Sequence, residues 1–173
     1  MTLLPSLALA VSICIATCGA AWGQVAPASV RLGMSEAELL AARPGLRLAR
    51  RPGHTSMGAV GKWTDSVDAS ADALGASTRT YYVAGGLLDQ VDRTLVLASA
   101  SDSLQAYARC VTELETRLGP GLKSSQTNAE SQFESESWSV EDRDVYVTRT
   151  AVGGRDVVRM VERRRHVMDA SQL

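Results

Sequence analysis

The sequence predicts an α+β fold, in which helices pack on one face of an antiparallel sheet. Helix-start signals occur at Ser35 and Asp102, and each helical segment is followed by short alternating runs that tight turns connect. Because the order of a helix and then hairpins occurs twice, the pattern is compatible with two pseudo-repeats, over residues 34–98 and 101–166. The two halves share no visible sequence identity, so the repeat is one of pattern only.

The first 30 residues contain no Asp, Glu, Lys or Arg, and every charge lies from Arg31 onward. An apolar run at residues 3–16 followed by small residues is typical of a secretory signal peptide. We expect a signal peptide at residues 1–23, with cleavage before Gln24 or, as a second choice, after Ala28. The protein is then periplasmic or secreted. No transmembrane segment remains, because the apolar run is shorter than the roughly 20 residues of a spanning helix.

A lipid anchor at Cys18 is an alternative to soluble export. Residues 15–18 (Ile-Ala-Thr-Cys) resemble a lipobox, but Thr17 fits poorly directly before the cysteine, so we expect soluble export. Cys14 and Cys18 leave with the signal peptide, and the mature chain then keeps one cysteine and no internal disulfide. We expect this residue, Cys110, to be a partly buried helix cysteine, with an intermolecular disulfide as the alternative.

The charge balance limits the classes of partner. The chain has 18 Lys+Arg and 19 Asp+Glu, which gives a formal net charge of −1. Proteins that bind nucleic acid usually carry a basic excess, so we do not expect a nucleic-acid partner.

The first half of the mature chain is expected to contain a linker, a short helix and four strands. The linker covers residues 24–33, and the helix begins with a capping box of Ser35 and Glu38 and ends at Pro44. The strands are expected at residues 46–49, 59–63, 78–83 and 87–97, with a polar connection at residues 65–77. The last strand has an apolar face that charged residues interrupt, which indicates either a bulge or a strand end that leaves the core. The face consists of Leu87, Val91, Leu95 and Leu97, and the interruptions are Asp89 and Arg93.

The second half contains the clearest helix. Its start is expected at a capping box of Asp102 and Gln105, and its end at Gly119-Pro120. Its apolar stripe consists of Leu104, Tyr107, Val111, Leu114 and Leu118. Residues 121–132 are expected to form a loop, and antiparallel strands follow at residues 133–140, 145–150 and 156–163. One domain thus covers residues 34–166, and residues 167–173 form a tail.

Few residues are suited to catalysis. The histidines, His54 and His166, are far apart, and no metal-ligand spacing, nucleophile elbow or phosphate-binding glycine loop occurs. We therefore expect no enzyme activity, no cofactor and no metal site. The alternative is a hydrolase or thiol enzyme that uses Cys110 or His54, although Cys110 lies in mid-helix rather than at a helix start, where thiolates are favoured.

The candidate binding residues are Trp63, Tyr81, Tyr82 and, in the preceding loop, His54. The aromatic residues fall in expected strands, and neighbours in a strand point to opposite faces, so either Tyr81 or Tyr82 should face away from the core. Exposed aromatic side chains on a sheet are good anchors for a partner. The basic run at residues 163–166 is expected to be a solvated strand end that pairs with acidic residues of the sheet, with an acidic partner as the alternative.

Residues 33–39, Gly-Met-Ser-Glu-Ala-Glu-Leu, resemble the helix opening Gly-Met-Thr/Ser-x-x-Glu-Val/Leu of small exported α+β proteins. These include outer-membrane assembly lipoproteins of the SmpA/OmlA type and proteins with the β-lactamase-inhibitor-like fold. Trp138 and the terminal hairpin are similar to the second half of such tandem-repeat proteins, whereas the insert at residues 65–77 departs from them. The resemblance implies a binding module of the cell envelope, in which the sheet or a loop meets another protein.

We therefore expect a non-enzymatic, exported protein-binding module, such as an inhibitor, an immunity factor or an envelope-assembly accessory. Its partner is expected to be another envelope or secreted protein. A small-ligand carrier that uses the groove between helix and sheet is the alternative from a different class.

Overall fold

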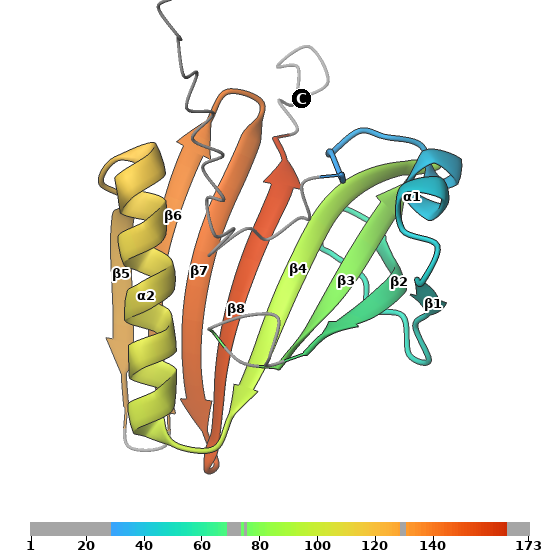
Figure 1. Ribbon diagram of the computed structural model, residues 1–173. Helices are drawn as coiled ribbons and strands as arrows, with labels where there is room; N and C mark the ends of the chain where they lie inside the picture. Colours follow the sequence, from blue (N-terminus) through green and yellow to red (C-terminus); the bar gives the residue numbers. More distant parts are fainter. Residues whose placement is uncertain (1–28, 69–73, 75, 129–130, 166–173) are drawn as a thin grey trace, which may run out of the picture.

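The computed structural model describes residues 29–68, 74, 76–128 and 131–165. It contains one eight-stranded antiparallel sheet with two helices packed against it (Figure 1), which confirms the predicted α+β fold. The expected signal peptide, the Cys18 anchor, His166 and the tail lie outside the described residues. Within the described ranges, neither helix combines the length and the apolar character that crossing a bilayer requires.

Each half of the chain supplies one helix and then four strands. The first half forms α1 (Glu36–Ala42), β1 (Arg47–Leu48), β2 (Val60–Val67), β3 (Ser77–Ala84) and β4 (Leu87–Leu97). The second half forms α2 (Ala100–Leu118), β5 (Leu122–Thr127), β6 (Ser131–Val140), β7 (Arg143–Val152) and β8 (Arg155–Arg164). Gly-Gly pairs with positive φ join β3 to β4 and β7 to β8, and such turns match the twist of the strands that they connect.

The strand order is β1-β2-β3-β4-β8-β7-β6-β5, so the last strands of the two halves pair at the centre of the sheet. The central ladder joins Gln90 with Arg163 at one end and Leu97 with Asp156 at the other. β1 and β5 form the two edges. The helix-then-hairpins order that the sequence pattern indicated is therefore present in both halves.

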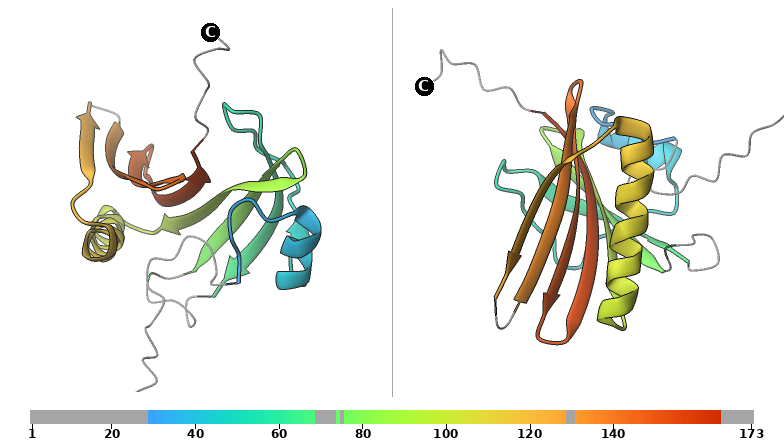
Figure 2. Two further views of the ribbon diagram at one scale, coloured as in Figure 1. Left: turned by 90° about the horizontal axis from the view of Figure 1, so that it is seen from above. Right: turned by 90° about the vertical axis from the view of Figure 1, so that its left-hand side faces the viewer.

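The sheet is curved, and the two helices lie on the side opposite to its hollow (Figure 2, left). The core fills the space between the helices and the sheet. Its fully buried apolar side chains include Leu39, Tyr81, Val91, Leu95, Cys110, Val147, Val158 and Met160. Curvature also buries the middle of the helix-free side, where Gln90, Asp92 and Val161 are buried although no helix covers them.

The first half differs from the expected elements at β2 and β4. β2 continues to Val67, into the stretch expected as a connection, because its ladder with β3 extends to the pair of Val67 and Ser77. Of the two alternatives expected for β4, the bulge is present, since Val83 pairs with Leu88 while the preceding residue pairs with Gln90. The extra residue reverses the alternation, so Leu88 is buried and Leu87, which was predicted to face the core, is exposed.

The expected linker is docked onto the sheet in its described part. Val30 is buried in the core cluster, and the Gly33 N–H donates a hydrogen bond of 2.7 Å to the Leu88 carbonyl. The capping box at the start of α1 is present as predicted.

In the second half, the start and the buried side of α2 differ from the prediction, and so does the presence of β5. The helix is capped by Ser99, which accepts from the Asp102 N–H, so Asp102 is not the cap. Leu104 is 47% exposed, whereas the neighbouring Ser103 is buried because its hydroxyl donates to Asp156 Oδ1 at 2.7 Å. β5 forms in residues expected to be a loop. All six of its residues are exposed, so no alternation of apolar residues marks this edge strand.

Candidate binding face

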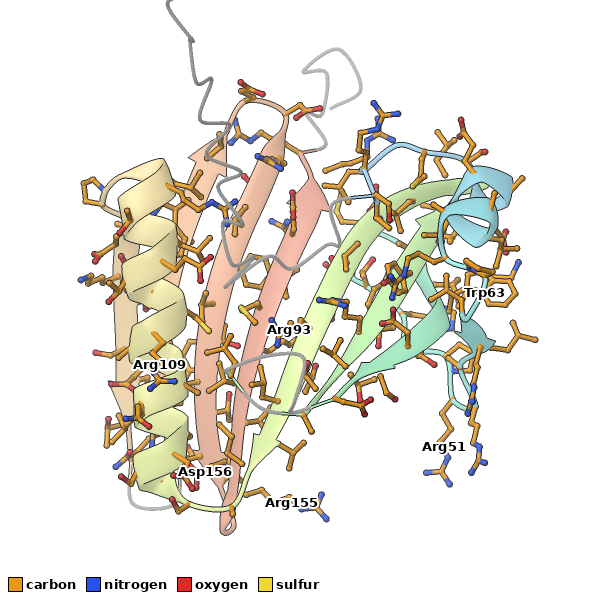
Figure 3. The ribbon with its side chains drawn as sticks, viewed as in Figure 1. Arg51, Trp63, Arg93, Arg109, Arg155 and Asp156 are labelled. Atoms are coloured by element: carbon orange, nitrogen blue, oxygen red, sulfur yellow. The ribbon has the colours of Figure 1, made fainter. Side chains whose placement is uncertain are left out.

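The predicted aromatic residues lie on opposite sides of the sheet. Tyr81 is 0% exposed, and its hydroxyl donates to Asp65 Oδ2 at 3.1 Å on the helix side. Tyr82 is half-buried on the other side, as the strand alternation predicted. Trp63 lies beside α1 (Figure 3), and its Nε1 donates to Glu36 Oε1 at 2.7 Å. Tyr82 is therefore the only one of the three that faces away from the helices.

His54 is exposed in the loop between β1 and β2, where it forms an isolated β-bridge with Val60. The backbone of this loop passes beside the Tyr82 ring at Gly53. The structure thus brings the His54 loop and Tyr82 to the same side of the sheet, and leaves Tyr81 and Trp63 on the other side.

The side chains of β3, β4, β8, β7 and β6 that alternate away from the helices form what we call the concave face. Cross-strand pairing places them in rows that run straight across the sheet. One row, which we call the hydroxyl row, continues beyond the concave face onto β2 and β5. It consists of Ser66, Thr78, Thr94, Arg159, Thr148, Ser135 and Ser124. It places a serine or threonine on every strand from β2 to β5 in the sheet order except β8, where Arg159 occupies the position.

Asp92 and Arg159 form the centre of the concave face. Asp92 is 3% exposed and accepts hydrogen bonds from Gln90 Nε2 at 2.7 Å and from Arg159 Nε at 2.9 Å, with a second contact from Arg159 Nη2. Tyr82 and Tyr146 lie close enough to this pair to interact with both charges. Burial raises the pKa of both phenols, so they remain neutral hydroxyl groups at neutral pH.

Gly61 fixes the position of Tyr82. A Cβ at residue 61 would lie 2.9 Å from Cε1 of Tyr82 and 3.0 Å from Cγ2 of Thr80, so the ring packs directly on the glycine backbone. A tyrosine held in this way loses little freedom when a partner covers it, which favours a role as an anchor.

Exposed apolar side chains gather at the end of the concave face near the β7–β8 turn. Val96 is 70% exposed and pairs with Val157, while Phe133 and Val152 are exposed on the neighbouring strands. We call these four residues the apolar end. Single exposed apolar residues are ordinary, but a contiguous group on a sheet favours an interaction surface.

The concave face has an unusual distribution of charge. Its alternating positions contain no Lys and no Glu. Four of its charged residues form two ion pairs, Asp92 with Arg159 and Asp144 with Arg163, and a fifth, Arg155, lies at the end of β8 opposite Val152. The glutamates of β6, Glu134 and Glu136, alternate with its serines, and they point to the helix side. Protein interfaces are poor in Lys and Glu and rich in Tyr and Arg, and this face matches both trends.

A cavity of about 240 Å³ lies at the opposite end of the concave face from the apolar end. Residues 55–57 of the His54 loop form one wall. Asp89 and Gln90 from β4, Asp144 from β7 and the arginines at positions 163–165 supply the remaining lining. The basic run therefore lies beside acidic residues within the sheet, as the sequence predicted for Arg163 and Arg165, which both contact Asp144.

A second cavity, of about 430 Å³, lies on the helix side between α2 and the strands β5 and β6. Glu136 is buried there, accepts the Gly121 N–H at 3.2 Å and lies 3.6 Å from Lys123 Nζ. Burial and the carboxylates of Glu136 and Glu134 raise the pKa of Tyr107, which lines this cavity, to about 12. This cavity corresponds to the groove that the small-ligand alternative requires.

The residues considered for catalysis are separated by the sheet. Cys110 is 0% exposed in the core between α2 and the strands, where a thiol is out of reach of substrates, while His54 is exposed on the other side. Among the residues that the structure describes, no group of three or more His, Cys, Asp or Glu side chains could hold a metal ion.

Sequence reasoning missed most of the concave face, notably Phe133, Tyr146, Thr148 and Arg159. A signal was present in β6, where serine or phenylalanine occupies every second position from 131 to 139 and glutamine, glutamate or tryptophan occupies the positions between them. Only the register with β7 and β8 shows that this polar side continues across the sheet.

Comparisons of the chain with models of protein families, with curated proteins and with solved structures found no match. The interpretation of the concave face therefore depends on its own residues.

Proposed function

We propose that the protein is a non-enzymatic, exported protein-binding module and that the concave face is its contact surface. The composition of this face is the observation that carries the proposal: a hydroxyl row, two tyrosines and an apolar end, without Lys or Glu. Tyrosine supplies large contact area at a low entropic cost, and serine supplies adaptable hydrogen bonds, as in antibody-like recognition surfaces. A regular sheet keeps these side chains in place before the partner arrives.

A plain solvated face is the competing explanation, because antiparallel sheets often expose one polar side to water. A solvated face is normally rich in Lys and Glu. On the concave face each of two aspartates is instead paired with an arginine, and the curvature buries Asp92 at the centre. Because the charges at the centre of the face are already paired, covering them with another protein has a lower desolvation cost.

The proposed partner is another envelope or secreted protein. This part of the proposal rests on the signal peptide expected at residues 1–23 and on the resemblance of residues 33–39 to small exported α+β proteins. An inhibitor, an immunity factor and an assembly accessory would all use such a face.

Site-specific photo-crosslinking tests the proposal. A benzophenone side chain is placed at Thr148 or Ser135 on the concave face, and at Gln105 on exposed α2 as the control, and each protein is irradiated with an envelope fraction of the source organism. We expect one adduct of the same mass from Thr148 and Ser135 and none from Gln105. Tyr82→Ala should reduce the adduct at least about tenfold, as expected for a tyrosine anchor.

Two results would contradict the proposal: the absence of a discrete adduct from either position on the concave face, or an adduct of equal yield from Gln105. Circular dichroism of Tyr82→Ala checks that the variant is folded before its adduct yield is compared.

The second candidate function is a small-ligand carrier, and the cavity of about 430 Å³ between α2 and β5–β6 favours it. Glu134, which lines this cavity, is paired with Arg149, so Glu136 is the carboxylate that a ligand would contact, and that ligand would be a small organic cation. Native mass spectrometry of freshly isolated protein would show such a ligand as an added mass, and Glu136→Gln should remove that mass.

A further inference from the structure

We infer that the cavity of about 240 Å³ at the end of the concave face is a carboxylate pocket that receives an acidic side chain of the protein partner. The inference rests on the proposed function, because it assigns ligand chemistry to one part of the same face. The observation behind it is a pair of arginines that the fold holds in place around a cavity, with most of their N–H donors unused by the part of the chain that the structure describes.

Arg163 and Arg165 are both oriented by contacts within the sheet. The Arg163 guanidinium lies 5.7 Å from the centre of the Tyr146 ring, and its Nη2 is 3.4 Å from Asp144 Oδ2. Arg165 donates from Nε to Asp144 Oδ1 at 3.1 Å and from Nη2 to the Arg143 carbonyl at 3.4 Å. A guanidinium has five N–H donors, so within the described residues these contacts leave four on Arg163 and three on Arg165 for a further acceptor.

The resident carboxylate of Asp144 does not neutralise the pocket. Burial alone would raise the pKa of Asp144, but hydrogen bonds from Ser139 and Arg165 and the charges of both arginines lower it, so the group is ionised at neutral pH. The lining as a whole has three arginines and two aspartates, Asp89 and Asp144, and therefore a formal charge of +1. One incoming carboxylate makes the pocket neutral. Arginine binds carboxylates through two parallel N–H···O bonds, which makes this the acceptor that the unused donors fit best.

The wall opposite the arginines is fixed by its own hydrogen bonds. The Thr55 N–H donates to the Ala59 carbonyl at 2.9 Å, and the Ala59 N–H donates to Thr55 Oγ1 at 3.0 Å. The space between this wall and the arginines equals the liquid volume of about eight water molecules, which is enough for an Asp or Glu side chain. Because both walls are in place before binding, little ordering has to accompany the insertion of a side chain.

Binding of a minimal probe tests the pocket directly. The full chain labelled with ¹⁵N is titrated with N-acetyl-aspartate amide, and with N-acetyl-asparagine amide as the uncharged control of the same shape. We expect the Nε–Hε signals of Arg163 and Arg165 to shift with the aspartate probe only, while Arg155 at the far end of β8 (Figure 3) does not respond. Arg165→Gln should weaken binding at least about tenfold, and Arg155→Gln should leave it unchanged.

A second variant should strengthen the binding of the aspartate probe, where Arg165→Gln should weaken it. Asp144→Asn removes the resident carboxylate, raises the formal charge of the lining to +2 and releases donors of both arginines. If the arginines bind carboxylates, the aspartate probe should bind Asp144→Asn more tightly than the unmodified protein. Equal or weaker binding would overturn the inference, as would an equal response to the asparagine probe.

Crosslinking from Ser135 separates this inference from the proposed function. If the pocket holds a side chain of the partner, Arg165→Gln reduces the Ser135 adduct and Arg155→Gln does not. If Arg165→Gln leaves the yield of the Ser135 adduct unchanged, the pocket does not bind the partner, but the concave face can still be its contact surface. The absence of any adduct in the unmodified protein overturns the proposed function, and with it the pocket as a partner site.

Discussion

Gly121 directly precedes β5, and its α-carbon faces two buried side chains of β6. A Cβ at this position would lie 2.6 Å from Glu136 Cγ and 2.7 Å from Trp138 Cε2. Alanine therefore has to displace packed side chains, and we expect Gly121→Ala to lower the free energy of unfolding by about 1–3 kcal/mol. Urea unfolding followed by tryptophan fluorescence measures the change.

The matched control for this prediction is Gly45→Ala. Gly45 lies in the turn after α1, has an ordinary backbone φ and would place its Cβ more than 4 Å from any atom beyond its two chain neighbours. Alanine at this position should be neutral or stabilise the protein by about 0.4–1 kcal/mol, because it reduces the freedom of the unfolded chain. Equal unfolding midpoints for the two variants would show that crowding at Gly121 does not limit stability.

At the scale of single residues, the alternation of side chains along a strand was predictable, whereas the hydrogen-bond partner of a side chain was not. The opposite directions of Tyr81 and Tyr82 follow from strand geometry alone, and the structure confirms them. The direction of Trp63 depends on Glu36, which lies 27 positions earlier in the sequence and accepts its indole N–H. No local pattern contains that information.

At the scale of elements, Arg149 connects α2 with β6 and β8. Its side chain is 2% exposed and contacts Ser103 Oγ at 2.8 Å, Asp156 Oδ1 at 3.4 Å and Glu134 Oε2 at 3.0 Å. We expect Arg149→Ala to lower the free energy of unfolding by about 3–5 kcal/mol, because it leaves the largely buried Asp156 without its ion-pair partner.

The control for Arg149 is Arg117→Ala on the exposed side of α2. Arg117 lies 3.9 Å from Glu113 in an exposed ion pair, so its removal should change the free energy of unfolding by less than about 1 kcal/mol. Chemical unfolding of Arg149→Ala, Asp156→Ala and the double variant isolates the coupling between the two side chains. A double variant as unstable as the sum of the single ones would show that the pair is not coupled.

The same polar cluster explains why the buried side of α2 was predicted incorrectly. Apolar periodicity assigns Leu104 to the core, but the helix buries Ser103, because the hydroxyl both donates to Asp156 and accepts from Arg149. Periodicity counts only apolar residues and cannot detect a buried serine. β5 was missed for a related reason: an exposed edge strand is held by backbone hydrogen bonds and needs no apolar alternation.

At the scale of the whole molecule, the fold class was predictable from the sequence and the concave face was not. Two capped helices and the Gly-Gly turns at 85–86 and 153–154 were enough to predict an antiparallel sheet with helices. The hydroxyl row needs the pairing of β4 with β8, in which Thr94 lies opposite Arg159, 65 positions later in the sequence. Sheet curvature, which buries Asp92 on the side without helices, is likewise a property of all strands together.

All four tyrosines of the chain resist ionisation, and this predicts how the molecule unfolds in alkali. Burial raises the pKa of Tyr81, Tyr82 and Tyr146, and burial together with Glu136 and Glu134 raises that of Tyr107 to about 12. A group with a raised pKa in the folded state contributes stability that is complete below its unfolded pKa, about 10 for tyrosine, and that is lost as the pH rises toward the folded value.

We therefore expect the free energy of unfolding to fall steeply above about pH 10, with the tyrosines ionising together as the fold opens. Absorbance at 295 nm should stay flat through about pH 10 and then rise in one transition that coincides with the loss of circular dichroism. In concentrated urea, all four tyrosines should instead titrate near pH 10.

Tyr81→Phe removes a strongly shifted phenol together with its hydrogen bond to Asp65. It should thus be less stable at neutral pH but lose less stability between about pH 10 and 12. Gradual ionisation of two or more tyrosines near pH 10, with the circular dichroism unchanged, would contradict their burial in the sheet.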